Sequence, residues 1–261
     1  QKKIPLIALF PKIDSKLKTD DGKEALNPKG LIPEAIIKIK KEFPNIGIMT
    51  DVALDPYTTH GQDGLISDDG TVKNDETIEI LKEQSLLYAE MGADIVAPSD
   101  MMDGRIGVIR NALENNKHSI TKIMAYSAKY SSSFYNPFRD AVGSSKNLGG
   151  FDKKNYQMDP ANSLEALTEI ELDIFEGADM IMIKPGLPYL DIIYITKTTF
   201  KMPTFAYQVS GEYSMIKSAS MNHYLDEKKV VLETLLSFKR AGCNGILTYY
   251  AVDAAEWLEE S

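Results

Sequence analysis

The sequence predicts an α/β protein folded as a (β/α)8 TIM barrel, and three observations support this. Short apolar runs rich in Ile, Val and Ala alternate with longer stretches of helical period along the chain. Polar residues follow these runs at their carboxyl ends, where barrel enzymes hold their catalytic groups. The length of 261 residues suits one barrel. We therefore expect a single catalytic domain over residues 1–261.

Seven apolar runs are predicted as parallel strands, at residues 4–10, 46–52, 93–99, 122–128, 178–184, 204–210 and 245–251. Stretches of helical period lie between them, at residues 33–43, 76–92, 105–115, 163–177, 190–200, 213–219 and 230–242. Seven strands fit either an open, doubly wound sheet or a barrel whose first strand lies in an N-terminal segment absent from this sequence. We favour the barrel, because polar residues follow strand after strand. They are Asp51, Ser99, Asp100, Lys129, Lys184, Ser210 and Tyr249.

Composition narrows the class of partner. A net charge of -9 without an extended Lys/Arg stripe argues against nucleic acid and against a membrane surface, so we expect a small-molecule ligand. The apolar runs are too short to span a membrane, and the N-terminal residues do not resemble a signal peptide. The single cysteine, Cys243, permits no internal disulfide. Together these features predict a cytoplasmic protein.

Two lysines stand at the ends of predicted neighbouring strands, Lys184 in MIMIKPGLPY and Lys129 in KIMAYSAKY. A buried lysine is costly unless it is paired or used, although a lysine at a strand end can also extend to solvent. An unprotonated lysine attacks a ketone to form a carbinolamine and then an iminium, and a neighbouring cation disfavours its charged form. One such lysine suits an aldolase. Two suit an enzyme that joins two ketone substrates.

The chain resembles the porphobilinogen synthase (5-aminolevulinate dehydratase) family from about Phe10 to its C-terminus. The resemblance lies in TDVALDPYTTHGQDG, NDETIE, ADIVAPSDMMDGRIGVIR, MAYSAKYSSSFYNPFRDAVGS, YQMDPAN, EGADMIMIKPGLPYLDII, AYQVSGEYSMIK and LLSFKRAG. It implies an eight-stranded barrel with an N-terminal arm, usually a homo-octamer assembled from dimers. The implied activity is that of a hydro-lyase of tetrapyrrole (heme) biosynthesis, which condenses two 5-aminolevulinate molecules to porphobilinogen with loss of two waters.

The resemblance also assigns the catalytic amines. Lys184 in the MIKPG block would form a Schiff base with the first substrate, and Lys129 in the SAKY block would do so with the second. Asp51 follows a predicted strand, where a carboxylate beside two lysines would hold an ammonium or move protons. A helix-capping role for Asp51 is the alternative.

Each substrate ends in a carboxylate, so the resemblance implies two sets of donors. Ser210 and Tyr249 match the clamp on the first carboxylate, although strand-end hydroxyls often bind only backbone. Arg139 and Lys154 match the clamp on the second, with Lys153 as a near-equivalent neighbour. The guanidinium of Arg139 suits this role because it grips a carboxylate with two parallel hydrogen bonds.

Metal use differs among members of the family. Zinc-dependent members carry three cysteines where this chain has Ala53, Asp55 and Asp63, which excludes a three-cysteine zinc site here. Asp55 and Asp63 offer hard oxygen ligands, which suit magnesium or a monovalent cation, and His60 is a weaker candidate ligand. Glu169 matches the family's allosteric magnesium ligand, although alone it resembles any exposed helix charge. The resemblance therefore predicts a magnesium-dependent allosteric enzyme.

Residues 143–157 form a Gly, Ser and Lys-rich stretch that we interpret either as a plain surface loop or as an active-site lid whose lysines close over an anionic substrate. Two other functions stay open. A single-lysine class I aldolase would leave the second lysine without a role, and this chain shows no Gly-rich phosphate loop after its last two strands. A non-catalytic barrel that binds a small acid predicts lysines with ordinary pKa values.

Overall fold

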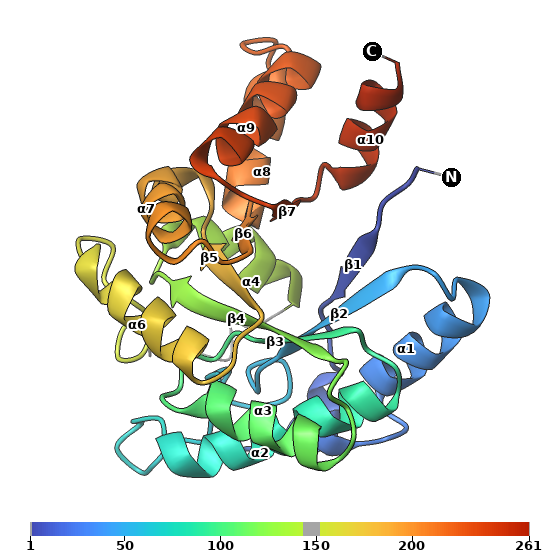
Figure 1. The fold of residues 1–261 in the computed structure, drawn as a ribbon, viewed down its shortest axis with the longest axis vertical. Coiled ribbons are helices and arrows are strands. Elements are labelled where there is room, and N and C mark those ends of the chain that lie inside the picture. Colours follow the sequence, from blue (N-terminus) through green and yellow to red (C-terminus); the bar gives the residue numbers. More distant parts are fainter. Residues whose placement is uncertain (1, 143–151, 261) are drawn as a thin grey trace.

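The computed structural model describes residues 2–142 and 152–260, without the side chains of Arg139, Asp140 and Val142. A sheet of seven parallel strands forms its centre, with the strands in chain order (Figure 1). The strands are β1 (Leu6–Leu9), β2 (Gly47–Val52), β3 (Ile95–Pro98), β4 (Lys122–Lys129), β5 (Met180–Lys184), β6 (Thr204–Tyr207) and β7 (Gly245–Leu247). Each lies inside one of the seven predicted runs or extends it by one residue.

The sequential strand order separates the two predicted architectures. A doubly wound sheet reverses its order at a switch point, whereas a barrel adds each strand beside the previous one. Strand order from β1 to β7 therefore confirms the barrel prediction. In the described residues no hydrogen-bonded ladder joins β1 to β7. The two chain ends lie near each other there (Figure 1), and Lys2 Nζ is 3.0 Å from Glu256 Oε1.

Helices surround the sheet on its outside (Figure 1). They are α1 (Leu31–Glu42), α2 (Asn74–Glu90), α3 (Arg105–Asn115), α4 (Asn136–Val142), α6 (Leu164–Phe175), α7 (Leu190–Phe200), α8 (Ser210–Met221), α9 (Glu227–Ala241) and α10 (Ala251–Glu259). Short 3-10 helices are η1 (Ser15–Leu17), η2 (Lys23–Leu26), η3 (Ser133–Tyr135) and η4 (Leu187–Tyr189). None of the helices in the described part of the chain is long and apolar enough to cross a membrane.

Two apolar layers follow from side chains that alternate along each strand. The larger layer packs the outer faces of the strands against the helices, with Ile48, Val96, Ile123 and Ile181 fully buried. The smaller layer fills the barrel interior. Its buried members are Met49, Ala97, Met124, Tyr126, Tyr135, Met182, Tyr207 and Val209. The interior is thus a packed core, and polar groups are confined to the carboxyl ends of the strands.

The structure differs from the predicted elements in several places. The predicted strand at residues 204–210 ends at Tyr207 as β6, with Ser210 already in α8, and helix α10 was not predicted. The last predicted strand, residues 245–251, is shortened to β7, because the Thr248 hydroxyl accepts a hydrogen bond from Tyr250 N (3.0 Å) in a turn that starts α10. Helix α4 was not predicted, because NPFRDAV is short and begins beside a proline. Of the predicted lid, residues 143–151 lie outside the described residues.

Candidate functional site

Lys129 and Lys184 end β4 and β5, and they are register partners in the parallel pair. A register irregularity in β4 lies between Ala125 and Ala128, just before Lys129. Partners at the same level of neighbouring strands project toward the same face of a sheet. The two amines predicted from sequence are therefore brought together at the carboxyl end of the barrel.

Two adjoining cavities meet at these lysines, and both are lined by Lys129, Lys184, Asp55 and Phe138. The first cavity adds Phe10, Pro11, Lys18, Asp51, Pro56 and Ser99. The second adds Tyr135, Lys153, Gln157, Tyr207, Val209, Ser210 and Tyr249. One pocket thus exposes both amines to the same small ligand, or to two ligands side by side.

Lys184 stands inside a ring of three tyrosines. Its Nζ lies 5.3 Å from the ring centre of Tyr126, 5.2 Å from that of Tyr135 and 4.8 Å from that of Tyr207. Burial lowers the pKa of Lys184 to about 7, and the charge of Lys129 lowers it in the same direction against the opposing effect of nearby carboxylates. A large fraction of Lys184 is therefore a free amine near neutral pH, as a nucleophile requires.

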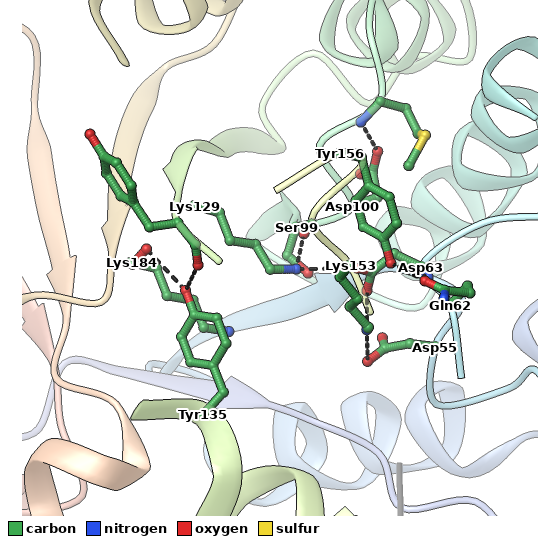
Figure 2. A network of polar contacts seen from close by, with 12 residues as sticks. Asp55, Gln62, Asp63, Ser99, Asp100, Lys129, Tyr135, Lys153, Tyr156 and Lys184 are labelled. Atoms are coloured by element: carbon green, nitrogen blue, oxygen red, sulfur yellow. Dashed lines mark hydrogen bonds and ion pairs between the residues drawn. The ribbon is translucent and has the colours of Figure 1, made fainter. Parts of the chain in front are cut away.

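Lys129 has a different environment, which Figure 2 shows beside that of Lys184. Its Nζ donates to the backbone carbonyl of Ser99 and lies 3.6 Å from Asp63 Oδ2. Only 5% of Lys129 is exposed. The two amines are thus distinct, because Lys129 has an anionic partner and Lys184 is surrounded by aromatic rings.

Lys153 completes a buried ion network with two of the aspartates predicted as metal ligands. Its Nζ lies 3.2 Å from Asp55 Oδ2 and 3.2 Å from Asp63 Oδ1 (Figure 2). Burial alone would raise the pKa of Asp63, but Lys129 and Lys153 outweigh it and lower the value to about 2. Burial alone would lower the pKa of Lys153, but the charges of Asp55 and Asp63 outweigh burial and raise that pKa. The site therefore holds fixed charges of both signs.

Asp51 lies near both amines in the first cavity. Burial, with a smaller contribution from the Asp55 charge, raises the pKa of Asp51 to about 6, against the opposing effect of Lys184. Its Oδ1 atom is buried without a hydrogen-bond partner in the described residues. A carboxyl group with this pKa can take up and release a proton near neutral pH.

The residues predicted to bind the two substrate carboxylates do not all lie in the pocket. Ser210 and Tyr249 both line the second cavity, where Ser210 Oγ accepts a hydrogen bond from Phe138 N (3.0 Å). The side chain of Arg139 lies outside the described residues. Lys154 points to solvent and pairs with Asp152, so the structure does not bring it to the pocket. Its neighbour Lys153 is the lysine of this segment that lines the second cavity.

Asp100 and Glu169 lie away from both cavities. Asp100 follows β3 but turns outward, where Arg105 Nε lies 3.4 Å from its Oδ2 atom. Arg105 Nη1 also lies 3.3 Å from Asp173 Oδ1 on α6, and all three residues are buried. Glu169 is half-buried on the same helix, and burial raises its pKa with further contributions from Asp103 and Asp173. This is a second charged region, outside the barrel mouth.

The described residues include no cluster of three His, Cys, Asp or Glu side chains arranged to hold a metal. Asp55 and Asp63 do not fit a directly bound metal in this arrangement, because the ammonium of Lys153 occupies the space between their carboxylates. His60 is held by backbone, since its Nδ1 accepts from Gln62 N (3.2 Å). Burial and the charges of Asp103 and Asp173 raise the pKa of Glu169, so a cation beside it would offset that repulsion.

Sequence reasoning missed several residues of the pocket. The three tyrosines around Lys184 are spread over β4, η3 and β6, and period-two patterning marks them only as apolar strand or loop residues. Lys18 follows η1 and lines the first cavity, where burial lowers its pKa. No motif or strand end marks Lys18, so only the folded chain places it there.

Comparisons with known proteins agree with this geometry. A family model described as Delta-aminolevulinic acid dehydratase matches residues 1–257. The chain is similar to the delta-aminolevulinic acid dehydratase of Bradyrhizobium diazoefficiens, with 58% identity over 255 residues that cover 98% of this chain and 72% of that protein. It is similar to the chloroplastic enzyme of Physcomitrium patens, with 54% identity over 252 residues that cover 97% of this chain and 58% of that protein.

A solved structure is similar along the whole fold. The porphobilinogen synthase of Toxoplasma gondii ME49, in complex with the reaction product porphobilinogen, superposes with a TM-score of 0.97 and 50% identity. The match covers 100% of this chain and 74% of that one. Across these three proteins, the chain thus spans between 58% and 74% of the length of its relatives.

Proposed function

Because this chain belongs to the Delta-aminolevulinic acid dehydratase family, we propose that it is a porphobilinogen synthase. In this reaction two 5-aminolevulinate molecules condense to porphobilinogen, and two waters leave. One observation carries the proposal: Lys129 and Lys184 are register partners that line the same two adjoining cavities. An asymmetric condensation needs two ketone-capturing amines in unlike surroundings, and the pocket supplies them.

Lys184 captures the first substrate in this proposal. Its free amine attacks the ketone carbon, the carbinolamine loses water, and the iminium becomes an electron sink. The tyrosine ring around Lys184 stabilises a cation there through the negative faces of the rings. Ser210 and Tyr249, which line the same cavity, offer hydroxyl donors to the substrate carboxylate.

Lys129 captures the second substrate. Asp63 and the Ser99 carbonyl hold its amine in one direction, so that the iminium carbon is presented to the first substrate. Lys153 lines the second cavity and is the lysine of the predicted lid that we propose to neutralise the second carboxylate, with Arg139 as its partner. Asp51, which lines the first cavity with both amines, takes protons from the reacting carbons.

Product formation tests the proposal directly. Incubation with 5-aminolevulinate should yield porphobilinogen, identified by its mass, with two waters lost for each two substrate molecules. A class I aldolase would instead cleave or form a sugar phosphate, and a non-catalytic binding protein would return 5-aminolevulinate unchanged. Either of the latter results with a folded protein would remove the assignment.

The proposed mechanism predicts that turnover rises with pH through neutrality. Lys184, with a pKa of about 7, is mostly ammonium at pH 6 and mostly free amine at pH 8, and only the free amine attacks a ketone. Below pH 6 we expect kcat/KM to fall at least roughly tenfold per pH unit. Steady-state rates between pH 5 and 9 measure this. A flat profile across pH 6–8 would contradict a nucleophilic Lys184.

We also propose that magnesium binds near Glu169 and stimulates the enzyme. Glu169, with Asp103 and Asp173 close to it, would hold a hydrated ion through water-mediated hydrogen bonds. Glu169→Gln should weaken the rise in Tm that magnesium causes, measured by calorimetry without substrate. The exposed Glu171→Gln on the same helix should leave that rise unchanged. Equal magnesium responses in the two variants would place the ion elsewhere.

Homo-octameric assembly and a cytoplasmic location stay predictions.

A further inference from the structure

Glu212 is a buried carboxylate that the proposed chemistry does not use. It lies in the first turn of α8 and is 1% exposed. Its Oε1 accepts a hydrogen bond from Leu187 N (2.6 Å), and its Oε2 accepts from Val209 N (2.6 Å) and, at greater length, from Gly186 N (3.4 Å). A buried carboxylate that binds only backbone N–H groups fixes the segments that supply them.

Those segments adjoin Lys184 and the second cavity. Gly186 and Leu187 follow directly after the Lys184–Pro185 bond, and Val209 precedes Ser210 and lines the second cavity. Gly186 packs closely against Phe238, since a Cβ atom built at Gly186 would lie 2.5 Å from the Phe238 ring. This packing leaves the loop little room to move. Glu212 therefore joins the end of β5 to the start of α8.

Burial raises the pKa of Glu212 to about 7, and the three backbone N–H groups oppose that rise. No charged side chain in the described part of the chain contributes to this balance. A protonated carboxyl group, or an amide in its place, has one donor group where the carboxylate has an acceptor oxygen. That donor would face a backbone N–H, so the hydrogen bonds to one of the two segments would be lost. The bridge is therefore complete only when Glu212 is ionised.

We propose that Glu212 is a positioning residue that orients Lys184 by holding the loop of residues 185–187 against α8. It touches neither cavity and transfers no proton to substrate. Its effect passes through the backbone to the nucleophile. This inference rests on the proposed function, since it concerns the amine that captures the first 5-aminolevulinate.

The test compares Glu212→Gln with the wild-type protein in two ways. Borohydride trapping with 5-aminolevulinate, followed by peptide mass mapping, should show adduct formation at Lys184 slowed about 10- to 100-fold, because an error of about 1 Å in a reacting group costs that much. Adduct formation at Lys129 should change less than about twofold. No adduct in the wild type would instead defeat the proposed function.

The pH profile separates positioning from a purely structural role. Between pH 5 and 7, a plot of log kcat/KM against pH should be less steep for Glu212→Gln than for the wild type. The slope should fall by about one log unit per pH unit, because the variant lacks one titrating carboxyl group. Asp51 and Lys184 titrate in both proteins, and burial keeps Tyr126 and Tyr207 neutral in this range by raising each pKa. Unchanged trapping and slope with only a lower Tm would overturn the inference.

Glu176→Gln is the matched control. Glu176 Oε2 accepts one backbone hydrogen bond from Gly107 N (3.0 Å) and lines neither cavity, so its replacement should leave trapping and slope unchanged. If Glu212→Gln does not fold, hydrogen exchange of the wild-type protein replaces it. Protection factors of the Leu187 and Val209 amides should fall between pH 8 and pH 6. Constant protection there would equally overturn the inference.

Discussion

Replacing Lys184 with methionine should lower turnover by on the order of 10⁴-fold or more, because the variant loses the amine that forms the first covalent bond. Methionine keeps a similar length and packs among the same three tyrosines, so the fold should persist. Steady-state rates with 5-aminolevulinate measure the loss, and circular dichroism checks the fold.

Lys154→Met is the control for this variant. Lys154 is an exposed lysine whose described ion pair, with Asp152, is also at the surface, so its removal should change the rate less than about twofold. Near-normal turnover in Lys184→Met would show that the proposed nucleophile is not needed. A loss of similar size in Lys154→Met would show that the lysine facing solvent in this structure takes part in the reaction.

Asp63→Asn should be the most destabilising single change at the site. Asp63 is 1% exposed and lies between two buried ammonium groups, those of Lys129 and Lys153. Without its charge these cations retain mainly Asp55, and an uncompensated buried charge costs about 3–5 kcal/mol. Urea unfolding at pH 7 measures the change in the free energy of unfolding. Asp68→Asn, in the exposed part of the same loop, should cost less than about 0.5 kcal/mol.

The double variant Asp63→Asn/Lys153→Met shows whether the loss comes from charge imbalance. It removes one anion and one cation together, so its destabilisation should be smaller than the sum of the two single variants. We expect a difference of about 1–3 kcal/mol. Additive losses within about 0.5 kcal/mol would show that Asp63 stabilises the protein through packing rather than through its charge.

The barrel could be predicted from the sequence because the same pattern of apolar run and helical stretch repeats along the chain. Each strand is a short apolar run, and every run after the first ends in a polar residue that chain order places at the same rim. This pattern fails at β7, which is shorter than predicted. Thr248 and Tyr250 are typical strand residues, but the Thr248 hydroxyl accepts a hydrogen bond from Tyr250 N and so forms a turn. Local patterning cannot distinguish a strand end from a turn built by a single side-chain hydrogen bond.

Within the site, strand-end lysines were predictable and loop residues were not. Lys129 and Lys184 lie at strand termini, so the topology fixes their register. Lys153 and Lys154 are adjacent in a segment without period, and only contacts with Asp55 and Asp63 determine that Lys153 turns inward. The same limit applies to Lys18, which lines the first cavity, and to the hydrogen bonds of Glu212 with Gly186 N and Leu187 N, which are 26 and 25 residues away in sequence.

Covalent capture at two positions tests the central claim most directly. The wild-type protein is treated with borohydride in the presence of 5-aminolevulinate, digested, and mapped by mass spectrometry. The account predicts reduced imine adducts on Lys184 and on Lys129, and none on the exposed Lys154. An adduct on one of the two lysines alone, or adducts spread over surface lysines, would contradict a pocket in which both amines capture a keto acid.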